Sequence, residues 1–139
     1  MVALERTSTR QEELSKFIVV LEDDDETRRG IERLLLTSGY RVQAERNADA
    51  ALARIRLSLL DLLLISTGAS RENRLRIARQ ICTESRLRKH HLPVVIFCDA
   101  DLEEGEERHV GNNFYLARPN NFDQLRALIK RLLAEPGRH

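Results

Sequence analysis

The chain has 139 residues, 42% of them hydrophobic, and its 23 basic and 22 acidic side chains leave a formal net charge of +1. This size and composition fit one globular domain with a single core. The balanced charge gives no basic footprint for nucleic acid, and aromatic residues, at 4%, are too scarce for base-stacking platforms. No apolar stretch approaches the roughly 20 residues that span a bilayer, and no hydrophobic signal segment opens the chain. We therefore expect a cytoplasmic protein without nucleic-acid or membrane partners.

The first half of the chain predicts two strands and two helices after a polar leader over residues 1–16. Residues 17–21 form a continuous apolar run, which is typical of a strand covered on both faces. The acidic residues 22–25 cap the following helix, which ends near Gly39, a residue suited to a left-handed helix end. Residues 40–44 alternate as in an edge strand, and Asn47 caps the next helix. The residues expected to face inward on these helices are Ile31, Leu34, Leu35, Ala51, Leu52 and Ile55.

The second half of the chain predicts three more strands. Residues 61–65 form a buried strand, Ser66 to Ser70 form a loop, and a helix follows. Later strands are expected over Val94–Phe97 and Phe114–Ala117, with a short acidic helix over 102–110 between them. A last helix follows residues 119–121. The residues expected to face inward on the longer helices are Leu75, Ala78, Ile81, Cys82, Phe122, Leu125, Leu128, Ile129 and Leu132.

Five strands alternating with five helices predict a doubly wound α/β protein with a parallel sheet, because crossover connections between parallel strands are right-handed. In such sheets, chemistry collects beyond the carboxyl ends of the strands. The residues expected at that edge are Glu22, Asp23, Ser66, Cys98 and Arg118.

Three segments carry a family resemblance. Residues 111–119, Gly-Asn-Asn-Phe-Tyr-Leu-Ala-Arg-Pro, are the best match; residues 19–24, with Arg28 just inside the helix, and residues 92–97 also match. In order and spacing they resemble a bacterial response-regulator receiver domain over residues 17–134. The resemblance implies a flavodoxin-like (CheY-like) fold with strand order 2-1-3-4-5 and helices on both faces. Residues 135–139 would then be a tail or a linker stub.

The chain departs from the receiver pattern at the positions that carry its chemistry. Ser66 stands at the position of the phosphoacceptor aspartate, Arg118 at that of the lysine that contacts the acyl phosphate, and Cys98 at that of the switch Ser/Thr. Arg74 stands where a glycine is common. The residues that keep the pattern are Glu22 and Asp23, the acidic pair, and Tyr115, the switch aromatic. The resemblance therefore implies a pseudo-receiver that signals by protein–protein contact, independently of phosphorylation and without enzymatic activity.

The residue at position 66 decides the expected chemistry. A carboxylate attacks phosphorus as an anion and also ligates Mg²⁺, whereas a serine hydroxyl needs a general base and is a poor substitute as a ligand. With only Glu22 and Asp23 left as anionic ligands, we expect Mg²⁺ binding to be weak or absent and no other cofactor. The guanidinium of Arg118 is expected to extend toward this pair in place of the metal.

Two other functions remain open. The chain could be a conventional phosphorelay receiver with altered acceptor chemistry. Residues 23–27 also fit the Asp-x-Asp-x-Thr string of haloacid-dehalogenase-like, Mg²⁺-dependent phosphohydrolases, which would make Asp23 a nucleophile and Asp25 an acid/base. The spacing speaks against this enzyme, because the helical pattern begins almost at once, where such enzymes insert a flap.

The expected partner is a signalling protein or a second copy of the chain. Residues 71–91 are mainly basic and 99–108 mainly acidic, and the two segments are expected to lie side by side and compensate each other. A homodimer would use the last strand, with Tyr115, and its flanking helices. The charges expected to pair across that dimer are Glu103, Glu104, Glu106 and Glu107 with Arg126, Lys130 and Arg131.

Overall fold

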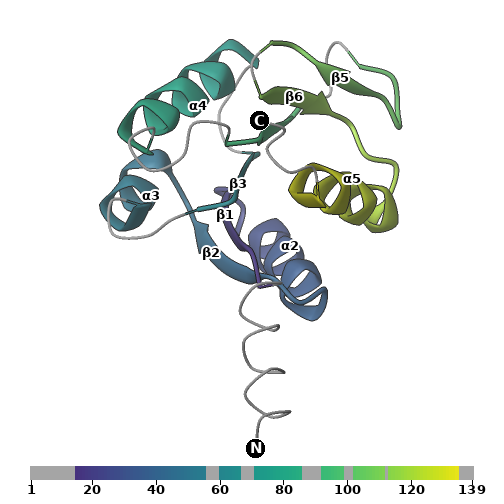
Figure 1. Ribbon diagram of the computed structural model, residues 1–139, viewed down its shortest axis with the longest axis horizontal. Helices are drawn as coiled ribbons and strands as arrows, with labels where there is room; N and C mark the ends of the chain where they lie inside the picture. Colours follow the sequence, from purple (N-terminus) through teal and green to yellow (C-terminus); the bar gives the residue numbers. More distant parts are fainter. Residues whose placement is uncertain are drawn as a thin grey trace, which may run out of the picture.

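The computed structural model describes residues 15–55, 60–66, 71–85, 92–98, 102–111 and 113–134 (Figure 1). The predicted leader and tail therefore lie almost wholly outside the described residues. The elements are β1 (Phe17–Leu21), α2 (Asp25–Thr37), β2 (Arg41–Glu45), α3 (Ala48–Ile55), β3 (Leu62–Ile65), α4 (Arg71–Ser85), β4 (Val94–Phe97), β5 (Glu107–His109), β6 (Phe114–Ala117) and α5 (Phe122–Ala134). No helix among these residues is both long and apolar enough to cross a bilayer.

The strands form one sheet in the order β2-β1-β3-β4-β6-β5. Neighbouring strands from β2 to β6 run parallel, and β5 is antiparallel to β6. The predicted parallel sheet with order 2-1-3-4-5 is thus confirmed for the five parallel strands. The sixth strand, at the sheet edge, was not predicted.

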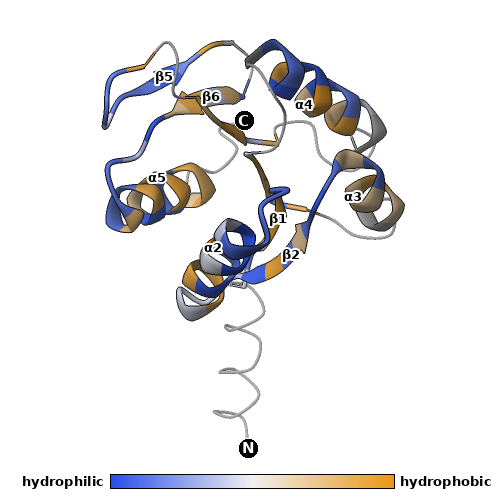
Figure 2. Cartoon of the chain, turned by 180° about the vertical axis from the view of Figure 1, so that it is seen from behind, coloured by the Kyte–Doolittle hydropathy of each residue, from blue (hydrophilic) through white to orange (hydrophobic). Residues whose placement is uncertain are grey.

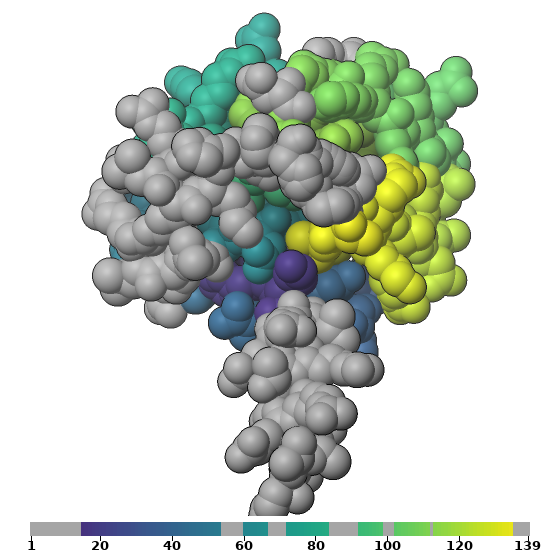
Figure 3. Space-filling model, viewed as in Figure 1, coloured from purple at the N-terminus to yellow at the C-terminus, as the bar shows by residue number. Residues whose placement is uncertain are grey.

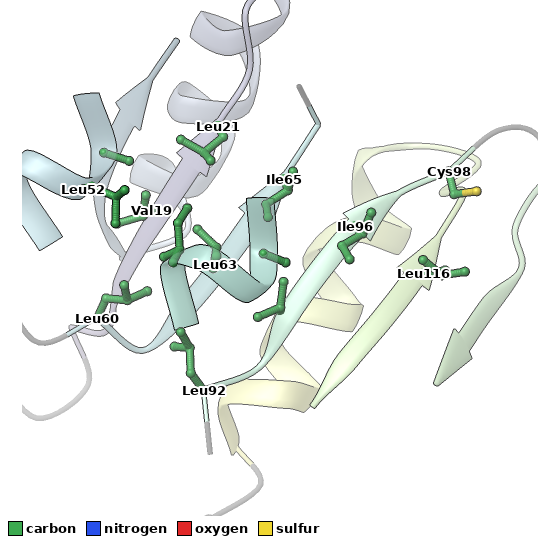
Figure 4. Packing of buried hydrophobic residues seen from close by; sticks show 14 of the residues in the cluster. Val19, Leu21, Leu52, Leu60, Leu63, Ile65, Leu92, Ile96, Cys98 and Leu116 are labelled. Carbon is green, nitrogen blue, oxygen red and sulfur yellow. The ribbon is translucent and has the colours of Figure 1, made fainter. Parts of the chain in front are cut away.

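Helices cover both faces of the sheet, as expected (Figure 1). Successive side chains of a strand point to opposite faces, so the buried strands divide their residues between two apolar clusters. Val19, Leu63 and Ile96 pack with α3 and α4 (Figure 4), and the alternate residues pack with α2 and α5. Figure 2 shows the matching apolar faces of the helices turned toward the sheet. Each fully buried aliphatic side chain contributes about 1.5–3 kcal/mol, so these two layers stabilise the edge where the site lies.

Most residues expected to face inward do so. Leu75 and Cys82 are partly buried, and the side chain of Ile55 is outside the described set. The fully confirmed set is Ile31, Leu34, Leu35, Ala51, Leu52, Ala78, Ile81, Leu125, Leu128, Ile129 and Leu132. The prediction for Phe122 is wrong, since its side chain is 55% exposed. Phe122 is the first residue of α5, and it lines a cleft beside α2 instead of being enclosed in the core.

The acidic helix predicted over 102–110 is also wrong. A turn closes there, with the Glu106 amide donating to the Glu103 carbonyl at 2.9 Å, and β5 follows. Gly105 in this turn has φ of +88°, which is incompatible with a continuing right-handed helix. Over 102–110 only Leu102 and Val110 are apolar, so a helix would have had no apolar face to bury, whereas β5 gains a hydrogen-bonded ladder with β6.

The β5–β6 hairpin is fixed to α5 by polar contacts. Arg131 Nη2 lies 2.7 Å from Glu107 Oε1, and Gln124 Nε2 donates to the Gly105 carbonyl at 2.6 Å. The hairpin, in light green, and α5, in yellow, form one continuous side of the molecule (Figure 3). The acidic side chain of Glu107 is therefore compensated by Arg131 of α5.

Candidate functional site

The parallel strands end at one edge of the sheet. Leu21 is in register with Ile65, Ile65 with Ile96, and Phe97 with Ala117. The residues that follow these strands, which the sequence singled out, are Glu22, Ser66, Cys98 and Arg118. They share this edge, but their partners differ: Ser66 bonds Glu22, whereas Arg118 bonds the Leu102 carbonyl.

Glu22 and Ser66 form the central contact of the site. Glu22 is only 6% exposed. One carboxylate oxygen, Oε1, accepts a hydrogen bond from the Ser66 hydroxyl, and the other, Oε2, accepts from the Asp24 amide at 2.9 Å. The backbones on both sides are fixed, because the Ser66 amide donates to the Leu21 carbonyl at 2.8 Å and the Glu22 amide to the Glu45 carbonyl at 3.0 Å. A buried carboxylate requires such donors, so the serine hydroxyl is part of what keeps Glu22 inside.

The next two acidic residues are held at the start of α2. Asp24 is its N-cap and accepts from the Thr27 amide at 2.8 Å and the Thr27 hydroxyl at 2.7 Å. These bonds, the hydroxyl's first, lower the pKa of Asp24. Asp25 Oδ1 accepts from Arg28 at 2.7 Å and Arg46 at 2.6 Å, and the bond from Arg28 is the main reason that the pKa of Asp25 is lowered. The predicted capping role of the acidic cluster is confirmed for Asp24.

Asp23 differs from its neighbours. It is exposed, and it forms no hydrogen bond or ion pair with any residue that the structure describes. Of the predicted acidic pair, one carboxylate is therefore buried and bonded within the chain, while the other faces solvent.

The residues at the two switch positions each have contacts of their own. Cys98 is buried in the cluster that packs with α3 and α4, near Leu116 (Figure 4). Tyr115 stacks on His109 of β5, with ring centroids 4.6 Å apart and planes inclined by 15°. The tyrosine is thus held by the hairpin that replaces the predicted acidic helix.

Arg118 does not replace the metal as the sequence led us to expect. Its Nη1 donates to the Leu102 carbonyl at 2.9 Å, and within the described residues it pairs with neither Glu22 nor Asp23. The arginine instead supports the turn before β5, which also bonds its backbone, since the Gly105 amide donates to the Arg118 carbonyl at 2.7 Å. The sequence did not predict this turn, so it could not predict that the Arg118 guanidinium would bond the Leu102 carbonyl.

Arg74, on α4, is the site residue that sequence reasoning most undervalued. Its Nη1 donates to the Phe97 carbonyl at the end of β4. Its Nε is buried and has no hydrogen-bond partner among the described residues. The only sequence signal was an arginine where the receiver pattern favours glycine. This long side chain brings a positive charge to the carboxyl edge of the sheet without any metal.

Comparisons with known proteins give the fold. No family profile and no curated protein sequence matches the chain. Among solved structures, it is similar to a CheY-like receiver domain from Methanospirillum hungatei, with 20% identity, a TM-score of 0.66, and coverage of 87% of this chain and 95% of that one. The receiver domain of the hybrid histidine kinase CckA has 19% identity, a TM-score of 0.63, and coverage of 84% and 98%.

A third similar structure is the response regulator TrrA from Thermotoga maritima in complex with Mg²⁺ and BeF, with 22% identity, a TM-score of 0.61, and coverage of 84% of this chain and 98% of that one. The chain therefore has the CheY-like fold of response-regulator receiver domains.

The residues at the carboxyl edge do not fit a receiver magnesium site. Mg²⁺ takes near-octahedral oxygen ligands and usually binds through one or two carboxylates. Both oxygens of Glu22 already accept hydrogen bonds, and position 66 supplies a neutral hydroxyl. Of the acidic pair, Asp23 alone has a carboxylate without a hydrogen-bond partner among the described residues. No group of three or more potential ligands among His, Cys, Asp and Glu gathers within the described part of the chain.

Proposed function

We propose that this chain is a degenerate receiver domain, or pseudo-receiver, that acts in signal transduction by phosphorylation-independent contact with a protein partner. The observation that carries the proposal is the hydrogen bond from the Ser66 hydroxyl to the buried carboxylate of Glu22. At the phosphoacceptor position of a CheY-like fold, the chain has a neutral group that is already bonded to Glu22, one member of the acidic pair. The receiver-like domain is assigned to residues 17–134, in the cytoplasm, and no enzymatic activity is proposed for it.

The proposed roles of the site residues follow from this contact. Ser66 is the degenerate acceptor position, and Glu22 and Asp23 are an acidic pair whose affinity for Mg²⁺ is weak or absent. Cys98 and Tyr115 occupy the switch positions. Arg118 occupies the lysine position but bonds the Leu102 carbonyl. Phosphoryl transfer to this edge would lack both an anionic nucleophile and a metal ion that neutralises the charge of the phosphoryl group.

A phosphorelay receiver with altered acceptor chemistry is the second candidate. The same Ser66–Glu22 hydrogen bond favours it, because a hydroxyl bonded to a carboxylate is the arrangement of a nucleophile and its general base. The product would be a phosphate ester of serine and not an acyl phosphate. Such an ester survives hydroxylamine, so the two candidates differ in a measurable property.

The position and the pKa of Asp25 argue against the phosphohydrolase alternative. This residue begins α2 directly, which leaves no room for a flap between Asp23 and the helix. Its carboxylate accepts from two arginines, Arg28 and Arg46, which keep it anionic. A carboxylate that acts as an acid/base needs a pKa raised toward the operating pH, whereas the pKa of Asp25 is lowered.

The experiment is intact-mass spectrometry after incubation with acetyl phosphate and Mg²⁺. We expect the natural chain to stay unmodified. Ser66→Asp is the matched variant, because it restores only the carboxylate, and any adduct on it should be removed by hydroxylamine. A hydroxylamine-labile adduct on the natural chain would refute the proposal, while a stable adduct on Ser66 would establish the second candidate.

The partner we propose is a signalling protein or a second copy, bound through β6 and its neighbours. The electrostatic part of the dimer expectation needs correction. Glu107 forms an ion pair with Arg131 at 2.7 Å, and Glu106 forms one with Arg108 at 2.8 Å. Because these ion pairs lie within one chain, the charges of these residues contribute little to pairing between two copies. An apolar centre would have to supply most of the affinity. Light scattering at micromolar concentration should give about twice the monomer mass of 16.0 kDa; a monomer at every concentration would leave only a heterologous partner.

A further inference from the structure

A cleft of about 460 Å³ opens between α2 and α5, at the ends of β4 and β6. Its volume is in the range of small-molecule sites, which are typically about 300–1,000 Å³. Its apolar wall contains Ile31 from α2, Phe97 from the end of β4, and Phe122 and Leu125 from α5. The helices that form it come from distant parts of the sequence, and both pack on the same face of the sheet.

Phe122 is the first indication that this cleft is a ligand-binding site. Its side chain is 55% exposed at the first position of α5. An exposed aromatic that lines a concave apolar surface is typical of binding sites. Leu36, on α2, is exposed to a similar extent, 51%, but does not line the cleft. It therefore offers a matched comparison.

Gly30 is the second, independent sign. It lies in the middle of α2 and lines the cleft. Glycine inside a helix costs about 0.5–1 kcal/mol relative to alanine. A Cβ added at Gly30 would meet no atom within 4 Å, so packing inside the chain does not explain the glycine. It leaves one wall of the cleft open to the close approach of another group.

The charged residues indicate which ligand chemistry fits. Arg118 lines the cleft and is partly buried, and within the described residues its guanidinium has a backbone carbonyl as partner and no carboxylate. Glu26 also lines the cleft but is exposed, so water screens its charge. A cation beside an apolar surface favours a ligand that carries an anionic group.

We propose that the cleft between α2 and α5 binds a small molecule that consists of an apolar ring system with one anionic group. The rings lie against Phe97 and Phe122 and approach α2 at Gly30, and the anionic group faces Arg118. This site uses neither Ser66 nor the acidic pair, so it does not depend on the proposed function.

Fluorescence titration with 8-anilinonaphthalene-1-sulfonate, an aromatic sulfonate, tests the proposal. We expect one saturable site per chain with a Kd of about 10–100 μM, from the usual affinity per atom of ligands of this size. Gly30→Leu fills the cleft and adds a better helix former, so it should stay folded and weaken binding at least about tenfold. Phe122→Ser should also weaken binding, while Leu36→Ser should not. A cooperative thermal melt of each variant verifies that the probe reports a folded protein.

The charge is tested with Arg118→Gln and a neutral probe. Arg118→Gln should weaken binding of the sulfonate about five- to tenfold and leave binding of N-phenyl-1-naphthylamine, which lacks the sulfonate, nearly unchanged. The proposal is overturned by an absence of saturable sulfonate binding, by unchanged binding to Gly30→Leu, or by equal losses in Phe122→Ser and Leu36→Ser. Equal losses of both probes in Arg118→Gln would overturn the anionic part of the ligand.

Discussion

Ser66→Ala tests whether the serine hydroxyl stabilises the fold through Glu22. Among the residues that the structure describes, the Glu22 carboxylate has two donors, and the substitution removes one of them and leaves the Asp24 amide. Because Glu22 is 6% exposed, water cannot readily replace the missing donor. Hydrogen bonds to charged groups contribute about 1.5–3 kcal/mol, and a buried acceptor left short of a donor costs a similar amount. We therefore expect a loss of about 2 kcal/mol in the free energy of unfolding.

The assay is urea denaturation, supported by thermal melts. A loss of about 2 kcal/mol should lower the Tm of a domain of this size by roughly 6–10 °C, with an unchanged dependence on urea. Ser38→Ala is the matched control, because the Ser38 hydroxyl donates at 2.8 Å to a neutral acceptor, the Leu34 carbonyl, at a helix end. It should cost about 1 kcal/mol or less.

A double-mutant cycle separates the contact from general effects of losing a hydroxyl. In a Glu22→Gln background, Ser66→Ala should cost less than in the natural chain, with a coupling of about 1–2 kcal/mol. If Ser66→Ala unfolds within about 0.5 kcal/mol of the natural chain, the hydroxyl is not what satisfies Glu22, and the account of the site is wrong.

Two further predictions concern other groups. In the folded state, Arg28 and Arg46 lower the pKa of Asp25, so the stabilisation by this carboxylate is present above the ordinary pKa of 3.8 and is lost as the pH falls through the lower folded pKa. The difference in Tm between the natural chain and Asp25→Asn should therefore shrink toward zero as the pH falls below about 3.8. A difference that persists at pH 2 would contradict this. Burial raises the pKa of the Cys82 thiol to about 11, so its alkylation by iodoacetamide at pH 8 should be much slower in the native chain than in urea; equal rates would contradict the burial.

Continuous apolar runs were the most reliable part of the sequence. β1 and β4 have the predicted bounds. Both strands are buried on both faces of the sheet, and a strand of this kind has a continuous run of apolar residues that is easy to recognise in the sequence. The segment over 102–110 was mispredicted because charge and length suggested a helix, whereas Gly105 and the pairing with β6 decided the structure. That pairing is a tertiary contact, which local patterns do not encode.

The candidate site was predictable in its location but not in its contacts. The carboxyl edge followed from the topology, so Glu22 and Ser66 were expected near each other. The partner of Arg118 was not predictable, because a long side chain has many accessible rotamers, and the Leu102 carbonyl reaches it only through the unforeseen turn. Arg74 was missed as a contributor for the same reason.

We propose that the edge holding Glu22 and Ser66 does not form a phosphoryl-type site with Mg²⁺. The most direct test is a ¹⁵N–¹H spectrum of the labelled chain before and after addition of Mg²⁺ and beryllofluoride, a phosphoryl mimic that coordinates a carboxylate. We expect unchanged amide signals for Ser66, Cys98 and Tyr115 in the natural chain, and new shifts only in Ser66→Asp. Saturable shifts at these three amides in the natural chain would contradict it.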